Sequence, residues 1–317
     1  MIRAMIARRI AIGIGILIAI SMIVFIAVHL LPGDAARTIL GREATPYTLR
    51  MLREQLGLSK PVPVQYLDWL RGLVTGKWGT SLVSSLHVSY IVGTHAENTA
   101  VLTVLTMLIA TPISILLGAY SALHSGKASD NVASVITLCL TAVPEFVIGI
   151  MMIFLFAASI FHILPAASLV SPTSSIFSQL KVTILPVATL VLGSIPYPTR
   201  MIRASMIDVL QSEYVMMARL KGLPERKVVL RHALRNALAP MIQASALTLL
   251  FLSGGVVVVE TVFSYPGVGY ALIQAVNQRD IPVIQTLVVL IAAACVVINL
   301  IADLAQIMVT PRLRARL

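Results

Sequence analysis

Charged side chains are scarce in this chain, and acidic ones most of all. Of its 317 residues, 12% are Asp, Glu, Lys or Arg, 58% are apolar, and 13 acidic residues stand against 24 basic ones. A soluble globular domain carries about 25% charged and about 45–50% apolar residues. The sequence therefore lacks the polar surface that a water-soluble domain needs, and its composition indicates an integral membrane protein.

Cysteine is also nearly absent, and familiar ligand and catalytic spacings are missing. The two cysteines, Cys139 and Cys295, lie in apolar runs, and the six histidines are scattered without a pattern such as H-E-x-x-H. We therefore expect neither a disulfide framework nor a metal site. The G-x-S-x-G turn is missing and no Ser/His/Asp arrangement stands out, so we predict no catalytic residues.

The phosphate-binding pattern G-x-x-x-x-G-K-[S/T] is absent as well. In nucleotide-binding proteins its backbone and lysine hold the phosphates of ATP. We expect no cofactor on this chain, and any ATP and Mg²⁺ that drive it to be held by partner chains.

Long apolar runs are what the chain has instead. A helix needs about 20 apolar residues to cross the hydrocarbon core. The first run is longer than the apolar core of a signal peptide, so we expect an uncleaved membrane helix there. The fourth is interrupted by Pro186, Pro196 and Pro198. Six runs are predicted as spans of a single membrane domain over 1–317: 10–31, 98–123, 132–161, 182–204, 238–262 and 281–309.

The basic residues predict an orientation. An even number of spans puts both termini on one side, and Lys and Arg gather at both termini and in the loop 205–237. The positive-inside rule places these segments in the cytoplasm and the loop 32–97 outside. The net charge of +11 is thereby explained by topology, and binding to nucleic acid is not needed to account for it.

The loop 32–97 carries signals of ordered structure. Thr45 is a suitable N-cap, Pro46 suits the first helical position, and leucines follow at helical spacing until Gly57. A second short helix is predicted from Val64 to Val74.

Residues 213–240 read EYVMMARLKGLPERKVVLRHALRNALAP, a basic segment between two apolar runs. Residues 205–221 favour a helix, Gly222 suits a left-handed helix end, and Pro224 suits the first turn of a new helix. The segment is thus predicted to form a corner between two short helices. On the second helix Lys227, Arg231 and Arg235 form a positive stripe, which faces either lipid headgroups or an acidic partner.

Glu145 follows Pro144 inside the third run. Ionisable groups at membrane depth are costly and are often functional. Two interpretations stay open: the carboxyl lines a transport pathway, or it makes a structural hydrogen bond at a kink.

Several stretches resemble those of one family. The segment E-Y-V-x-x-A-R-x-K-G-L followed by R-H-A-L-R-N-A-L-x-P is similar to the cytoplasmic coupling loop of binding-protein-dependent ABC importer permeases of the dipeptide/oligopeptide/nickel type. So are LLPGD at 30–34, QLGLSKPVPVQY at 55–66, ETVFSYPGVGYALIQAVNQRDIPVIQ at 260–285 and the ending N-L-x-x-D-L. The resemblance runs in order along nearly the whole chain.

The resemblance implies an all-α fold, a six-transmembrane-helix type I importer bundle with cytoplasmic coupling helices. It gives residues 205–237 the role of docking on an ATPase, carried here by Ala218, Arg219, Lys221, Gly222 and Leu223. Small Ala218 and Gly222 would allow close approach, and the cations would meet acidic groups. Of the family signature E-A-A-x-x-x-G, only the second alanine, Ala218, and the glycine, Gly222, are present.

The resemblance also implies partners: a second, homologous permease, two cytoplasmic ATP-binding subunits, an extracytoplasmic solute-binding protein and membrane lipids. Residues 263–280, with Tyr265, Pro266 and Gly267, would face the binding protein. The location would be the bacterial cytoplasmic membrane and the substrate a di- or oligopeptide. Nickel-chelate or glutathione import, an intramembrane enzyme, and a channel or sensor stay open as alternatives.

Overall fold

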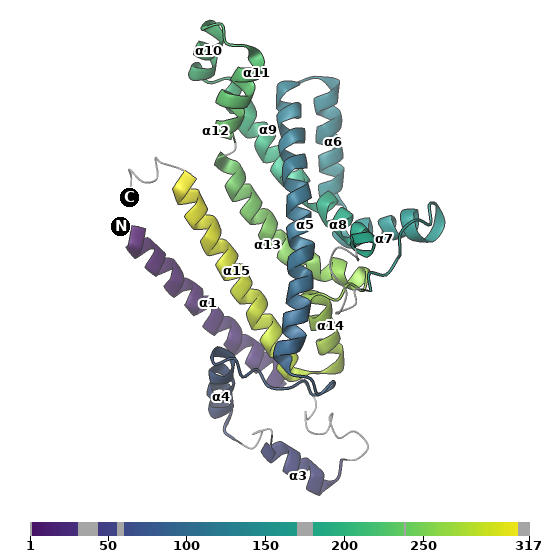
Figure 1. The fold of residues 1–317 in the computed structure, drawn as a ribbon. Helices are drawn as coiled ribbons and strands as arrows, with labels where there is room; N and C mark the ends of the chain where they lie inside the picture. The colour runs from purple at the N-terminus through teal and green to yellow at the C-terminus, as the bar shows by residue number, and fades with distance from the viewer. Residues whose placement is uncertain (1, 31–43, 56–59, 170–179, 238, 310–317) are drawn as a thin grey trace. The chain divides into compact units, whose positions relative to one another are not determined.

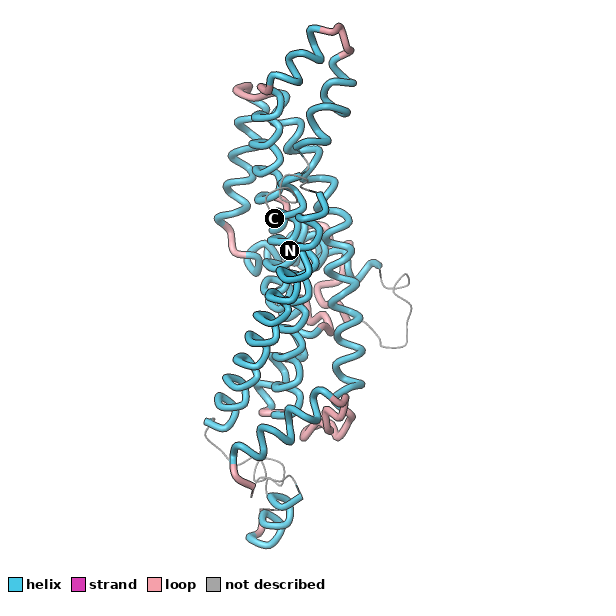
Figure 2. Tube along the Cα trace, turned by 90° about the vertical axis from the view of Figure 1, so that its left-hand side faces the viewer, coloured by secondary structure: helices cyan, strands magenta, loops and turns pink. Residues whose placement is uncertain are grey.

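The computed structural model describes residues 2–30, 44–55, 60–169, 180–237 and 239–309. Helices make up most of these ranges, and the only strand-like pairing within them is an isolated bridge between Thr80 and His87. Figure 1 gives the helix labels, and Figure 2 shows the helices in cyan and the described loops in pink. The expected all-α fold is confirmed.

The longest helix is α5, with 36 residues, followed by α1 and α15 with 29 each, and the shortest helices lie between residues 225 and 237. The elements, with π-helical turns marked η, are as follows: α1 (Ile2–Leu30), α3 (Pro46–Gln55), α4 (Val62–Val74), α5 (Val88–Leu123), α6 (Ala128–Ala142), α7 (Glu145–Ile153), η2 (Phe154–Ser159), α8 (Leu180–Ser194), α9 (Pro196–Leu210), α10 (Glu213–Leu220), α11 (Glu225–Lys227), η4 (Val228–Leu234), α12 (Arg235–Ala237), α13 (Ala239–Val262), α14 (Val268–Gln278) and α15 (Ile281–Val309).

Four stretches in the described ranges are long and apolar enough to cross a membrane: Ile6–Leu30, Val88–Leu123, Leu180–Leu210 and Ile281–Leu304. The bent pair α6 and α7–η2 adds a fifth if it counts as one span. The run expected at 238–262 is helical as α13, of which Leu247–Val262 is the apolar stretch found. The expected runs are thus helical over most of their described length, with the second helix beginning earlier, at Val88. Six complete spans at the expected boundaries stay a prediction.

The third expected span, 132–161, is not one continuous helix. Its two halves, Ala128–Ala142 and Glu145–Ser159, are bent by 99°. Val143 is extended at φ −89° and ψ 124°, and Pro144 precedes the first residue of α7. Proline removes a backbone donor and forces the residue before it out of the helical region. The bend therefore follows from Pro144, and it places Glu145 in the first turn of α7.

The prolines of the fourth run do not break it. Pro186 lies inside α8, and Ile195 keeps helical angles between α8 and α9. Pro196 and Pro198 stand in the first turn of α9, where the fixed φ of proline suits the helix. The result is the apolar stretch Leu180–Leu210, longer at its end than the predicted 182–204.

The chain forms two compact units, of which the first comprises Met1–Asn98 and Gly267–Val296. Its buried apolar side chains come from α1, the start of α5, α14 and the start of α15, and include Val28, Val88, Ala271 and Leu287. Asp280, 4% exposed, accepts hydrogen bonds from the Ser81 hydroxyl and, at 3.1 Å, from the Leu82 N–H. These bonds fix the loop before α5 to the turn between α14 and α15.

The two helices predicted in the loop 32–97 are confirmed as α3 and α4; Gly57 lies outside the described residues. Thr45 caps α3, because its hydroxyl accepts the Thr48 N–H at 3.2 Å. In α4, Tyr66 hydrogen-bonds the Ser21 hydroxyl of α1 at 2.8 Å and its ring meets that of Phe25 edge-on. The second helix is thus packed on α1 through aromatic contacts.

The second unit comprises Thr99–Pro266 and Val297–Leu317. One apolar cluster joins α5, α8 and α13 and includes Leu102, Leu190, Leu252 and Phe263. Another joins the end of α5 to α9, η4 and α12. The basic corner is built on this second cluster.

Candidate functional site

The arm that carries the corner is α9, and the chain turns sharply where it ends (Figure 1). We expected one helix over 205–221; the structure breaks it at Gln211 and Ser212 into α9 and α10. Ser212 is extended at φ −72° and ψ 149°, and its hydroxyl donates to the Val209 carbonyl at 2.5 Å. Serine competes for backbone groups in this way, which favours helix ends over helix interiors.

The corner itself is formed as predicted around Gly222. This residue has φ +74°, and the Leu223 N–H donates to the Ala218 carbonyl at 3.4 Å. A left-handed glycine followed by a bond back to the last turn is a common helix stop. Pro224 is the N-cap residue of the next helix, one position earlier than expected, and its carbonyl accepts the Lys227 N–H at 2.8 Å.

An ion pair spans the corner. The Arg219 guanidinium donates to both carboxylate oxygens of Glu225, at 2.6 and 3.2 Å. This hydrogen bond lowers the pKa of Glu225 and raises that of Arg219. Arg219 therefore already has an anionic partner within its own loop. Lys221 makes no ion pair among the described residues and is exposed.

Ala218 faces inward, which corrects the expectation that it lets a partner approach. It is 6% exposed and packs with Val215 and Val228, both fully buried, and with Val209 and Leu223. The corner thus has a small apolar core of its own. Leu223 belongs to that core, whereas Gly222 is exposed at the tip.

The outer face of α10 is apolar and exposed. Tyr214, Met216, Met217 and Leu220 have 45%, 61%, 54% and 71% of their surface exposed. We call these four residues the α10 apolar face. Sequence reasoning missed it, because a helix as short as α10 that is apolar nearly all round does not show which side is buried. Exposed apolar patches of this kind mark surfaces that bind a partner or a membrane.

The positive stripe is also exposed. Lys227, Arg231 and Arg235 all point outward from α11, η4 and α12. The π-helical turn η4 was not anticipated from the sequence. Asn236, the residue after Arg235 of the stripe, links α12 to α10: its side-chain amide donates to the Tyr214 hydroxyl at 3.0 Å.

Glu145 lies against two glycines on neighbouring helices. A Cβ on Gly255 of α13 would come within 1.8 Å of the Glu145 carboxylate, and one on Gly193 of α8 within 3.2 Å of its side chain. Glu145 makes no hydrogen bond or ion pair to the residues that the structure describes, so the kink hydrogen bond is not seen among them. An apolar groove of about 450 Å³ lies elsewhere in this unit, lined by residues such as Met107, Pro112 and Leu249.

Tyr265 is a core residue, which corrects the expectation that it faces the binding protein. It is 1% exposed, and its N–H donates to the Glu260 carbonyl at 2.7 Å. Glu260 is fully buried as well and accepts the Thr99 hydroxyl at 2.6 Å. Gly267 is buried and Pro266 half-buried, whereas Val276 and the following Asn277 are exposed.

Among the side chains that the structure describes, no group of three or more His, Cys, Asp or Glu lies close enough together to hold a metal ion.

Comparison with known proteins identifies the family to which the chain belongs. Residues 114–315 match the family described as the binding-protein-dependent transport system inner membrane component, and residues 1–116 match its N-terminal counterpart. The chain belongs to this family and is an integral inner-membrane transport permease subunit, not an enzyme. Membership implies that it works with an ATPase and a solute-binding protein.

Individual relatives cover the whole chain. A probable peptide ABC transporter permease of Sinorhizobium fredii is 34% identical over 309 residues, 98% of each chain. A glutathione transport system permease of Pectobacterium atrosepticum is 36% identical over 298 residues, 94% of each. A dipeptide transport system permease of Alkalihalophilus pseudofirmus is 34% identical over 97% of this chain and 98% of the relative.

Proposed function

We propose that this chain is one of two homologous permeases in an importer of di- or oligopeptides, driven by two ATP-binding subunits and loaded by an extracytoplasmic binding protein. The full-length similarity to permeases named for peptide and dipeptide transport carries the substrate assignment. Glutathione import is a second candidate, because the relative from Pectobacterium is 36% identical.

Both termini and the corner lie in the cytoplasm in this proposal, on the ground of the basic loops. The ATPase docks on the exposed tip around Lys221 and Gly222 and on the α10 apolar face. Ala218, Leu223 and the Arg219–Glu225 pair hold the corner in shape from within. ATP then acts by favouring the arrangement of the permeases to which closed ATPases bind better.

We also propose different contact residues for the binding protein. Since Tyr265 is buried, we assign the contact to the exposed end of α14, around Val276 and Asn277, with Pro266 and Gly267 positioning the segment.

The docking proposal is tested by co-purification of the ATPase subunits from membranes in which the chain is expressed with its partners. Leu220→Asp puts a charge on a side chain that is 71% exposed and leaves the corner's core untouched. Val74→Asp, at an exposed position of α4 (81%), is the matched control. We expect the ATPase to be lost with Leu220→Asp and retained with Val74→Asp; equal retention would overturn the proposal.

The substrate assignment is tested separately, by uptake of labelled dipeptide and labelled glutathione into cells that carry the complete system. Uptake of dipeptide that unlabelled glutathione does not compete away supports the first candidate. Uptake of glutathione alone supports the second.

A further inference from the structure

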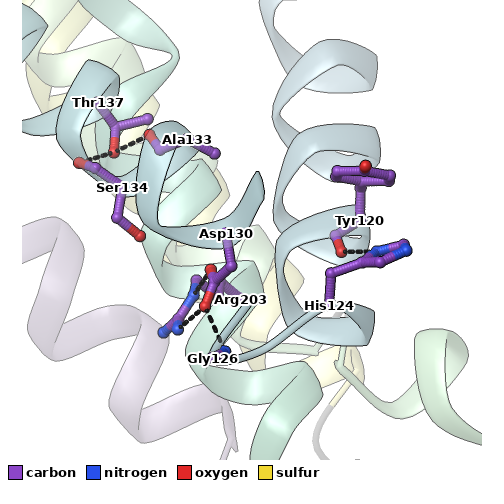
Figure 3. A network of polar contacts seen from close by, with 8 residues as sticks. All are labelled: Tyr120, His124, Gly126, Asp130, Ala133, Ser134, Thr137 and Arg203. Atoms are coloured by element: carbon purple, nitrogen blue, oxygen red, sulfur yellow. Dashed lines mark hydrogen bonds and ion pairs between the residues drawn. The ribbon is translucent and has the colours of Figure 1, made fainter. Parts of the chain in front are cut away.

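The pair Asp130–Arg203 joins two helices of the second unit at one point (Figure 3). The Arg203 Nε donates to Asp130 Oδ1 at 2.6 Å and its Nη2 donates to Oδ2 at 2.7 Å. The Gly126 N–H donates to Oδ2 at 3.0 Å. The carboxylate side chain is 1% exposed and that of Arg203 31%. Three donors therefore fix one buried carboxylate to α9 and to the turn between α5 and α6.

Arg203 stands on the arm that carries the basic corner. Its neighbours Ile202 and Met206 are buried with Ala233 of η4 and Ala237 of α12, the elements that return from the corner. A Cβ on Gly118 of α5 would come within 2.7 Å of the Thr199 carbonyl. Since α9, η4, α12 and the end of α5 are packed this closely, a displacement of the corner reaches Arg203.

Asp130 stands on α6, which packs mainly along α9 and buries few of its own side chains. Asp130 and Thr137 are the buried residues of α6, while its apolar side chains Val132, Val135 and Leu138 are more than half exposed. The far end of α6 leads through Pro144 to Glu145 and its glycine contacts. The ion pair is thus the main polar link between the corner's arm and the α6–α7 bend.

One hydroxyl beside this link suggests a second arrangement. Thr199 Oγ1 on α9 is buried and has no hydrogen-bond partner among the described residues. Buried hydroxyls are normally satisfied. A small shift of α9 against α5 and α6 would offer it a new acceptor. A buried ion pair is also a poor source of stability, and its best-attested use is to fix register.

We propose that Asp130 and Arg203 are positioning residues that transmit movement of the corner to the α6–α7 bend. The inference rests on the proposed function, because it needs an ATPase on the corner. The pair itself touches neither substrate nor ATP.

The test uses the complete complex in proteoliposomes and measures peptide uptake per ATP hydrolysed. In Asp130→Asn and Arg203→Gln we expect normal assembly, continued hydrolysis and a loss of uptake per ATP of about tenfold. Arg203→Lys should retain more coupling than Arg203→Gln. The matched control is Arg200→Gln, an exposed arginine one turn earlier on α9, which should leave the ratio unchanged.

The outcomes distinguish a role of the ion pair in coupling from a merely structural role. If Asp130→Asn and Arg203→Gln assemble and transport as wild type per ATP, the proposal is overturned. If they reduce assembly alone, with unchanged uptake per ATP in the assembled fraction, the pair is merely structural and the proposal is equally overturned. If neither assembles, Arg203→Lys, which keeps the charge but not the two-point hydrogen bond, decides it: a reduced uptake per ATP supports the proposal and an unchanged ratio refutes it. Absence of an ATPase from the wild-type complex refutes the proposed function instead.

Discussion

Gly222 holds a backbone angle φ of +74°, and nothing lies within 4 Å of the place a Cβ would take. Alanine would fit sterically there, yet a left-handed conformation costs about 1–2 kcal/mol for a residue with a Cβ. We predict that Gly222→Ala opens the corner about 5- to 30-fold more often. Limited trypsin cleavage after Lys221 should accelerate accordingly. Gly222→Asn should accelerate less, because Asn tolerates this conformation; an unchanged rate in Gly222→Ala would refute this account of the corner.

Gly255 and Gly254 are adjacent in α13 but differ in surroundings. A Cβ on Gly255 would overlap the Glu145 carboxylate at 1.8 Å, whereas Gly254 has nothing within 4 Å. The overlapping atoms are the end of the flexible Glu145 side chain, which can turn aside, so we predict that Gly255→Ala destabilises the purified chain by only about 1 kcal/mol, the low end of the overpacking range. Gly254→Ala should be neutral or slightly stabilising. Thermal unfolding in detergent distinguishes them, and Glu145→Ala should rescue Gly255→Ala. Equal melting temperatures for the two single variants would contradict the observed Glu145 position.

At the scale of elements, the ion pair between Arg219 and Glu225 holds the α10–α11 corner together. The hydrogen bond from Arg219 holds the pKa of Glu225 below its ordinary value of 4.5. A carboxyl whose pKa is depressed on folding contributes stability above its unfolded pKa and loses it as the pH falls through the folded value. Both side chains are largely exposed, at 43% and 59%, so solvent screening keeps the effect small.

The expected result is a corner that is insensitive to pH above 4.5. A spin label on Lys221→Cys, in a chain with Cys139→Ser and Cys295→Ser, should keep its mobility as the pH falls to 4.5 and become more mobile below that. Glu225→Gln should be mobile throughout. A mobility change centred near neutral pH in the wild-type sequence would contradict the assignment.

Some features of the helices and turns could be predicted from the sequence, and others could not. The stop at Gly222, the cap at Thr45 and the apolar runs follow from local residue chemistry and were predicted. The break at Ser212 follows from the serine side chain, a local signal that the prediction of one helix over 205–221 overlooked. The π-turn η4 depends on the packing of buried residues such as Val228 and Ala233, which no local pattern reveals. Burial of Tyr265 and Ala218 was missed for the same reason. The Asp130–Arg203 pair links residues 73 positions apart, beyond any spacing rule.

At the scale of the whole molecule, the account predicts a membrane topology. In the same chain without native cysteines, Lys221→Cys should react with a membrane-impermeant maleimide only after the cytoplasmic side is opened. Val74→Cys should react in intact spheroplasts, because the loop 32–97 lies on the outer side of the membrane. Both termini and the corner lie on the opposite, cytoplasmic side. Reaction of Lys221→Cys from outside would overturn the orientation.

The central claim is that the α10 apolar face is where the ATPase acts on this permease. A photo-crosslinking amino acid in place of Leu220 tests it most directly, with the same substitution at Val74 as the control, since both side chains are exposed at 71% and 81%. The account predicts an adduct with the ATP-binding subunit from position 220 and none from position 74. No ATPase adduct at 220, or equal adducts at both, would contradict it.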